Sequence, residues 1–241
     1  MILLDCGNSS IKAQRYEQDR LLASFSCAYR LDWCSALAAW LAPASGLPVY
    51  LCSVLDPDRQ SGLDACLRDF DVTRFVSTAE ALGVTNGYRE PSRLGSDRWM
   101  ALLGAAGCSP GACLVIDAGS AITLDLLDAN RRHLGGAILP GFNTSIDTFR
   151  RIFSHIDFDD PAIAASDEPG ISTETAIQID YANGSITRLP VLVKRWTPLF
   201  EDQPTLLLAG GDAARVQSLL GLPARLLPDL VFRGMRRLIA S

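Results

Sequence analysis

The chain has 241 residues, of which 48% are hydrophobic and 20% are charged, and its net charge is −5. This length fits one large domain or two domains of about 100–120 residues. The acidic balance argues against nucleic acid as a partner, because binding to its backbone needs clustered Lys and Arg.

The first half shows alternating strand and helix patterns. Apolar runs predict strands at 1–5, 10–16, 21–27, 48–54 and 72–76. Helices are expected at 32–42, near 57–69 and at 99–106. A cluster of turn-forming residues at 107–112 then predicts a domain junction.

The second half repeats this theme. Strands are expected at 112–117, 121–127, 134–139 and 205–209, and helices around 143–154 and 173–197. Strands that alternate with helices predict an α/β fold with a mixed sheet. The apolar runs are shorter than the roughly 18 residues that cross a bilayer, so we expect no membrane partner. The N-terminus lacks a signal peptide and the seven cysteines lack metal-site spacing, which together predict a cytoplasmic protein.

Two apolar runs end in the same motif, Asp-x-Gly followed by small polar residues. Met1-Ile-Leu-Leu leads into Asp5-Cys-Gly-Asn-Ser-Ser, and Cys113-Leu-Val-Ile leads into Asp117-Ala-Gly-Ser. The two copies lie nearly half a chain length apart. A buried strand that ends in a carboxylate, a glycine turn and hydroxyls suits metal-phosphate chemistry. One copy in each half therefore predicts a duplicated fold that holds a nucleotide between the copies.

The residues after the first strand suit the phosphates of a nucleotide. Gly7 allows a tight turn and a close approach of the backbone to a ligand. Lys12 supplies a positive charge, and the carboxylate of Asp5 can hold Mg²⁺ directly or through water. Further donors come from a polar run, Asn8, Ser9 and Ser10. The alternative is a plain β-hairpin whose turn happens to be polar.

A second polar segment precedes the helix predicted at 99–106. It runs Gly95-Ser-Asp97-Arg98. An aspartate just before an apolar helical run is typical of a helix N-cap, and the spacing alone favours that structural role. Arg98 and the upstream turn Asn86-Gly-Tyr88 also resemble the wall of a polar pocket. The two roles of Asp97 can coexist.

Paired glycines follow two apolar runs of the second half. They lie in Gly135-Gly-Ala-Ile-Leu-Pro-Gly141 and in Gly210-Gly211-Asp212. Each allows close approach of the backbone, either to another chain segment or to a flat ligand such as adenine with ribose. The chain contains neither a Walker P-loop nor a Rossmann glycine fingerprint, so these two nucleotide folds are not indicated.

In this order and spacing the motifs resemble the type III pantothenate kinases, a branch of the superfamily of acetate and sugar kinases and actin. Asp5-Cys-Gly-Asn-Ser9 and Asp117-Ala-Gly-Ser-Ala-Ile-Thr123 resemble the two phosphate loops of that family. The segments that end in Tyr88 and Arg98 resemble its pantothenate-binding loop. The resemblance implies two duplicated ribonuclease H-like (actin-like ATPase) domains, 1–110 and 111–241. Each would be a mixed sheet flanked by helices, with the active site in the cleft between them.

The resemblance also implies a reaction, the ATP-dependent phosphorylation of pantothenate to 4'-phosphopantothenate, the first step of coenzyme A synthesis. It makes Asp97 the general base, gives Mg²⁺ with phosphate to Asp5 and gives a monovalent cation, K⁺ or NH₄⁺, to Asp117. The ATP-binding residues that it implies are Asp5, Cys6, Gly7, Asn8, Ser9, Ser10, Ile11, Lys12 and Ser120. The substrate-binding residues are Tyr88, Gly95, Ser96, Asp97, Arg98 and Thr173.

Thr173 lies where the family reaches pantothenate across a homodimer interface, so a homodimer is expected. Two residues depart from the family pattern: Ser120 replaces the usual threonine, and Ser96 stands where alanine is frequent. Two alternatives stay open, another phosphotransferase of the same fold and a regulatory accessory protein of the same fold.

Overall fold

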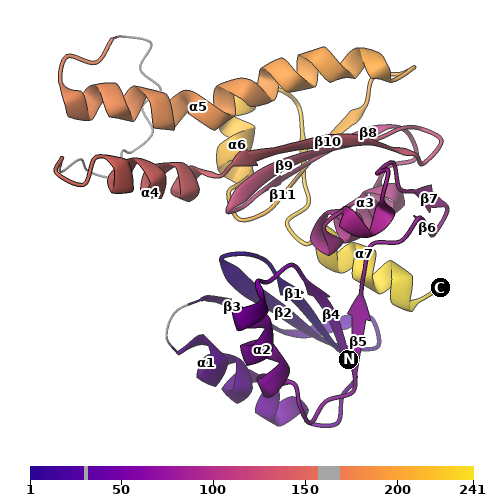
Figure 1. The fold of residues 1–241 in the computed structure, drawn as a ribbon. Coiled ribbons are helices and arrows are strands. Elements are labelled where there is room, and N and C mark those ends of the chain that lie inside the picture. The colour runs from indigo at the N-terminus through magenta and orange to yellow at the C-terminus, as the bar shows by residue number, and fades with distance from the viewer. Residues whose placement is uncertain (30–31, 157–168) are drawn as a thin grey trace. The chain divides into compact units, whose positions relative to one another are not determined.

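The computed structural model describes residues 1–29, 32–156 and 169–241, without the side chains of 178–187. The chain forms two compact units. The first comprises Met1–Cys108 together with Leu230–Ser241, and the second comprises Ser109–Asp229. Each unit contains a five-stranded mixed sheet and its own helices (Figure 1). Among the described residues, no helix is long and apolar enough to cross a membrane.

The first unit is built on a sheet with the strand order β3-β2-β1-β4-β5. Its strands are β1 Ile2–Cys6, β2 Ser10–Glu17, β3 Arg20–Ala28, β4 Val49–Ser53 and β5 Val72–Phe75. The first three form an antiparallel meander, whereas β1, β4 and β5 run parallel. Its helices are α1 Trp33–Leu41, α2 Pro57–Cys66, α3 Ser96–Cys108 and α7 Leu230–Ile239. Short elements complete it: η1 Ala42–Ala44, β6 Glu80–Ala81, β7 Val84–Thr85 and η2 Pro91–Arg93.

The two faces of this sheet pack against different helices. Because successive side chains of a strand point to opposite faces, Ile2 and Leu4 of β1 share one face. These two residues belong to a buried cluster that includes Trp33 of α1 and Leu63 of α2. The opposite face carries Asp5. On that side α3 contacts β4 and α7 contacts β1.

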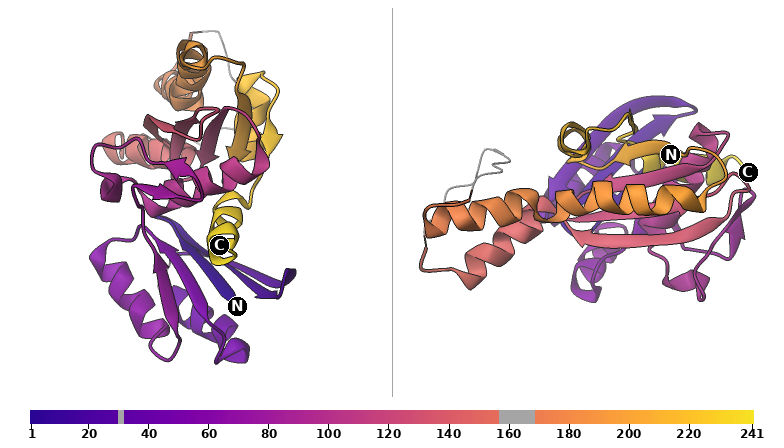
Figure 2. Two further views of the ribbon diagram at one scale, coloured as in Figure 1. Left: turned by 90° about the vertical axis from the view of Figure 1, so that its right-hand side faces the viewer. Right: turned by 90° about the horizontal axis from the view of Figure 1, so that it is seen from above.

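The second unit repeats the same sheet, with the order β10-β9-β8-β11-β12. Its strands are β8 Cys113–Ala118, β9 Ala121–Leu127, β10 His133–Pro140, β11 Thr205–Ala209 and β12 Arg225–Leu226. Its helices are α4 Phe142–Ile152, α5 Thr173–Trp196, η3 Thr197–Leu199 and α6 Ala213–Leu220. Helices α4 and α5 lie side by side, and the later part of α5 runs along the sheet (Figure 2).

The observed architecture confirms the predicted α/β class with two duplicated mixed sheets flanked by helices. Strands expected at 112–117, 121–127 and 205–209 match β8, β9 and β11 closely. Helices α6 and α7 and the short strand β12 were not predicted. The division into units also differs from the expected domains 1–110 and 111–241, because Leu230–Ser241 clusters with the first unit.

Helices α3 and α7 cross at two glycines that have no room for a side chain. A Cβ at Gly234 would collide with the Met100 carbonyl group, 2.7 Å from its carbon. A Cβ at Gly104 would collide with the carbonyl oxygen of Leu230. Both obstacles are backbone atoms, which cannot rotate away. The crossing therefore fixes α7 against α3 at a separation that only glycine permits.

We expect Gly234→Ala to lower the free energy of unfolding by about 1–3 kcal/mol, the usual cost of forcing extra volume into a packed core. Urea unfolding followed by circular dichroism measures this change. Gly107→Ala is the matched control, because its Cβ would meet only the flexible Arg237 side chain. That control should stay within about 1 kcal/mol of the parent, since alanine favours the helix. Equal stability of both variants would contradict the proposed crossing constraint.

Candidate active site

The first phosphate loop is the hairpin turn between β1 and β2. The Gly7 amide donates to the Ser10 carbonyl oxygen at 3.1 Å and closes the turn. Asn8 and Ser9 are exposed at its tip. The predicted hairpin is confirmed, and phosphate binding at its turn stays a prediction.

Strand register determines which side chains accompany Asp5. It pairs with Lys12 on the antiparallel neighbour β2 and with Cys52 on the parallel neighbour β4. Paired residues on adjacent strands point to the same face of a sheet. The neighbours of Lys12 on β2, Ile11 and Ala13, lie in the hydrophobic cluster on the opposite face. Asp5, Lys12 and Cys52 therefore share the face against which α3 packs.

Ser96 attaches the start of α3 to the end of β4. Its hydroxyl donates to the Ser53 carbonyl oxygen at 3.0 Å and accepts from the Cys52 thiol at 3.4 Å. The Ser96 side chain is buried. An alanine at this position would lack both bonds.

Asp97 lies in the first turn of α3, where its carboxylate folds back toward the preceding loop. Its Oδ1 accepts from the Arg98 amide at 2.8 Å, and the Gly95 carbonyl accepts from the Trp99 amide at 2.9 Å. The residue before the helix is therefore Gly95, so Asp97 is not the N-cap in the strict sense. A Cβ at Gly95 would lie 2.5 Å from Asp97 Oδ1. Glycine is needed here because the carboxylate occupies that space.

Arg98 and Tyr88, the residues expected to form the wall of a polar pocket, contact each other directly. The Nη1 atom of Arg98 donates to the Tyr88 hydroxyl at 2.7 Å, and the guanidinium carbon lies 5.5 Å from the ring centroid. Arg98 is only 6% exposed. Because the Arg98 guanidinium is buried, an anionic group can reach it only along a path bounded by neighbouring residues. Tyr88 is one of these residues.

Asn86 is a residue whose role the sequence did not reveal. Its side-chain amide donates to the carbonyl oxygens of Thr78 and Pro91, both at 3.1 Å, and its Oδ1 accepts from the Tyr88 amide at 3.0 Å. It is buried. Asn86 thus ties together three points of the segment that precedes α3 and orients Tyr88. The Asn-Gly pair signalled a turn, but not these contacts.

Two buried thiols lie near these carboxylates. Burial raises the pKa of the Cys52 thiol well above its ordinary value, and the charges of Asp5 and Asp97 raise it further, against the Ser96 hydrogen bond. Burial and Asp5 likewise raise the pKa of the Cys6 thiol. Both cysteines are therefore neutral at physiological pH. Asp5 and Asp97 belong to one neighbourhood of the first unit, because Cys52 is the strand partner of Asp5 and its thiol donates to Ser96, the residue before Asp97.

The second copy of the motif forms a shorter turn in the second unit. The Gly119 amide donates to the Ala121 carbonyl oxygen at 3.0 Å. Asp117 is the penultimate residue of β8 and pairs with Thr123 on β9, where the first copy pairs aspartate with lysine. Asp117 and Ser120 are partly exposed. The second loop thus has the same layout but lacks a lysine at the paired position.

The later glycines of this unit pack against the second loop. A Cβ at Gly210, which has φ +88°, would meet Asp117 Oδ1 at 2.5 Å and collide with the Ala118 carbonyl oxygen. A Cβ at Gly141 would lie 2.6 Å from the Ser120 carbonyl oxygen, which also accepts from Thr144 at 2.6 Å. Of the two explanations offered by the sequence, these glycines fit the approach of another chain segment.

Thr173 is the first residue of α5 and is exposed. Ser172 precedes it as the N-cap and forms a reciprocal capping box with Thr175, with hydrogen bonds at 3.0 and 3.2 Å. The capping residues fix the start of the helix, which leaves the Thr173 side chain outside the capping box.

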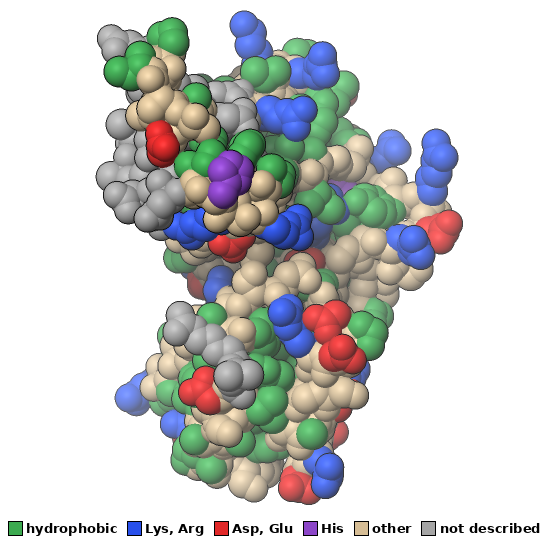
Figure 3. Space-filling model, turned by 60° about the vertical axis from the view of Figure 1, so that its left-hand side comes forward, with side chains coloured by type: hydrophobic (Ala, Val, Ile, Leu, Met, Phe, Trp, Pro, Cys, Tyr) green, Lys and Arg blue, Asp and Glu red, His purple; other side chains and the backbone are tan. Residues whose placement is uncertain are grey.

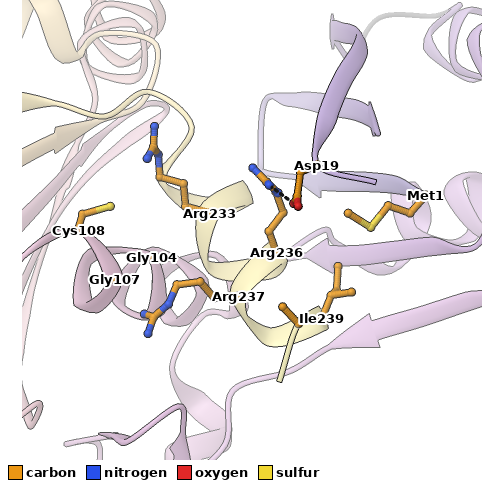
Figure 4. Close-up of a pocket in the computed structure, with 10 residues that line it drawn as sticks. Met1, Asp19, Gly104, Gly107, Cys108, Arg233, Arg236, Arg237 and Ile239 are labelled. Atoms are coloured by element: carbon orange, nitrogen blue, oxygen red, sulfur yellow. Dashed lines mark hydrogen bonds and ion pairs between the residues drawn. The ribbon is translucent and has the colours of Figure 1, made fainter. Parts of the chain in front are cut away.

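A cavity of about 490 Å³ lies in the first unit beside α7 (Figure 4). Arg233, Arg236 and Arg237 line it, but their guanidinium groups point in different directions. Arg236 pairs with Asp19 at 2.7 Å, and Arg237 donates to the Leu103 carbonyl oxygen. None of the predicted site residues lines this cavity. It is therefore separate from the candidate site.

Comparison with known proteins identifies the family to which the chain is similar. A family model described as type III pantothenate kinase matches residues 1–195. A type III pantothenate kinase of Pseudomonas aeruginosa is 37% identical over 249 residues, which cover 98% of this chain and 97% of the relative. One from Halorhodospira halophila is 34% identical over 246 residues, with 97% and 95% covered.

Solved structures show the same fold at lower identity. The activator of 2-hydroxyisocaproyl-CoA dehydratase from Clostridium difficile, solved with bound ADPNP, is 15% identical with a TM-score of 0.54. The match covers 97% of this chain and 90% of that one. These findings confirm the fold and the resemblance inferred from the motifs. The chain belongs to the type III pantothenate kinase family.

Proposed function

We propose that this pantothenate kinase uses Asp97 as the general base for the substrate hydroxyl and the first phosphate loop to bind ATP. The observation that carries the proposal is the geometry around Cys52, which is the strand partner of Asp5 and donates its thiol hydrogen to Ser96, the residue before Asp97. One carboxylate for the metal-phosphate group and one for the attacking hydroxyl are the two acidic groups that phosphoryl transfer needs. Here Asp5 lies on the sheet face against which α3, the helix that carries Asp97, packs.

Phosphoryl transfer depends mainly on position and charge, because its transition state is loose and needs little covalent help. The hydroxyl of pantothenate loses its proton late, so a carboxylate of ordinary basicity is sufficient. In this proposal Asp97 accepts that proton while Arg98 and Tyr88 hold the substrate. The packing of Gly95 against the carboxylate keeps Asp97 in place before the substrate arrives.

The residues present fit a divalent metal that arrives with ATP. Among the described residues, no group of three or more His, Cys, Asp or Glu side chains could hold a metal by itself. Mg²⁺ is commonly bound by one or two carboxylates together with substrate phosphates and water. Asp5, partly exposed at the end of β1, suits that arrangement. When bound, the metal would neutralise phosphate charge.

We assign the monovalent cation, K⁺ or NH₄⁺, to Asp117, and a contact with ATP to Ser120. Asp117 is a partly exposed carboxylate next to the turn of the second loop. The second loop lacks a lysine at the position of Lys12, so an added cation would supply a positive charge there.

The expected homodimer and the role of Thr173 in it belong to the same proposal. Support comes from the α4–α5 pair, where Ile152 is 60% exposed and Ile171, just before α5, is 98% exposed. Hydrophobic side chains are visible on the surface in Figure 3. Apolar groups exposed next to Thr173 suit a partner surface. The cytoplasmic location stays a prediction.

The proposed reaction is tested by coupled detection of ADP release. We expect release that depends on pantothenate, is stimulated by K⁺ or NH₄⁺ and is not replaced by hexoses or by polyphosphate. Asp117→Asn should reduce the stimulation while a basal rate remains. Release without pantothenate, or with a sugar in its place, would instead indicate a different phosphotransferase.

Asp97→Asn should lower kcat by about 10²–10⁴-fold, the usual contribution of general-base catalysis. The Kd for ATP should stay near the parent value, because the amide keeps the size of the side chain. Asp69→Asn, an exposed carboxylate of the same unit, is the matched control and should be unchanged. A variant with near-normal kcat would limit Asp97 to organising the first turn of α3.

Asp5→Ala should weaken the use of ATP and Mg²⁺ together, because both depend on the same carboxylate. Titration of Mg²⁺ at several ATP concentrations measures this coupling, and thermal unfolding confirms that the variant is folded. Mg²⁺ dependence identical to that of the parent would remove Asp5 from the metal site.

A further inference from the structure

Arg59 contacts the first phosphate loop from a helix that no phosphate-loop motif includes. It lies in the first turn of α2, and its Nη1 atom donates to the Asn8 carbonyl oxygen at 2.7 Å. Fifty-one positions separate the two residues. The contact joins a charged donor to the exposed tip of the turn, which is the part that a phosphate would meet.

The Arg59 side chain is aimed at this carbonyl by two neighbours, Asp56 and Tyr29. Asp56, the N-cap of α2, accepts from the Arg59 amide at 3.0 Å and lies 3.4 Å from Nη1 through its other oxygen. The guanidinium carbon lies 5.1 Å from the centroid of the Tyr29 ring, and that ring packs edge-on against Trp33 at 5.1 Å. An arginine held by a carboxylate and an aromatic face has lost much of its freedom before it meets the loop.

The second carbonyl of the tip is also held from outside the turn. The Tyr29 amide donates to the Ser9 carbonyl oxygen at 3.1 Å. In a trans peptide the N–H points away from the C=O. Fixing the carbonyls of Asn8 and Ser9 therefore also fixes the direction of the Ser9 and Ser10 amides. These amides are the backbone donors that a phosphate at the tip would use.

We propose that Arg59 is a positioning residue for ATP, which orients the backbone donors of the first phosphate loop by holding the Asn8 carbonyl. The inference rests on the proposed function of that loop. Arg59 acts through the peptide rather than on the reacting atoms. Its loss should affect the binding of nucleotide and leave pantothenate and the chemical step unchanged.

The test compares Arg59→Ala with Arg68→Ala. Arg68 is an exposed arginine of the same unit and has no hydrogen bond or ion pair with a described residue, so its loss removes the same charge without touching the loop. We expect Arg59→Ala to raise the KM and the Kd for ATP by about 10- to 100-fold, the scale of a hydrogen bond from a charged donor. The kcat, the KM for pantothenate and the Tm should match those of Arg68→Ala.

Arg59→Lys and Arg59→Gln complete the test and guard against a variant that fails to fold. Lysine keeps the positive charge but lacks the planar guanidinium group. The KM of Arg59→Lys for ATP should therefore lie between those of the parent and the alanine variant. Equal ATP affinity in Arg59→Ala and Arg68→Ala would overturn the proposal, as would a parallel loss of kcat, both KM values and Tm. If Asp5→Ala also leaves ATP binding unchanged, the assignment of the loop itself fails rather than the role of Arg59.

Discussion

The parallel pairing of β1 with β4 is the constraint on which the candidate site depends. It aligns Asp5 with Cys52 on one face of the sheet, while the alternate side chains of both strands fill the core on the other. The end of β4 then receives Ser96, so that α3 begins there and carries Asp97 to the same face. A register shift of one residue would turn Asp5 toward the core and separate the two carboxylates.

The two units show that a repeated fold need not repeat its chemistry. Both sheets have the same strand order, and both place an aspartate and a glycine turn after the first strand. The first turn is one residue longer and opposes its aspartate with Lys12, whereas the second opposes it with Thr123. The surroundings differ too. Arg59 and Tyr29 hold the first turn, while Gly141 packs against the second.

The sequence predicted the parts of this structure that depend on local pattern. Strands give an alternating or continuous apolar pattern in the sequence, and glycine with small polar residues marks a turn. The sheets and both loops could therefore be located from the sequence. Contacts between distant segments give no such pattern in the sequence. Arg59 looks like an ordinary surface arginine of α2, and Asn86 like a simple turn residue. Helix α7 was not predicted, and its packing against α3, over a hundred residues away in the chain, leaves no local pattern.

The crossing of α3 with α7 has a consequence for the order in which the protein is made. Helix α3 carries Asp97, yet the helix that packs against it follows the whole second unit in the chain. The second unit, Ser109–Asp229, is therefore synthesised in full before α7 can close the first. Until α7 has been made, the nascent chain holds its proposed catalytic helix without that support. A product that terminates before Leu230 lacks the support permanently.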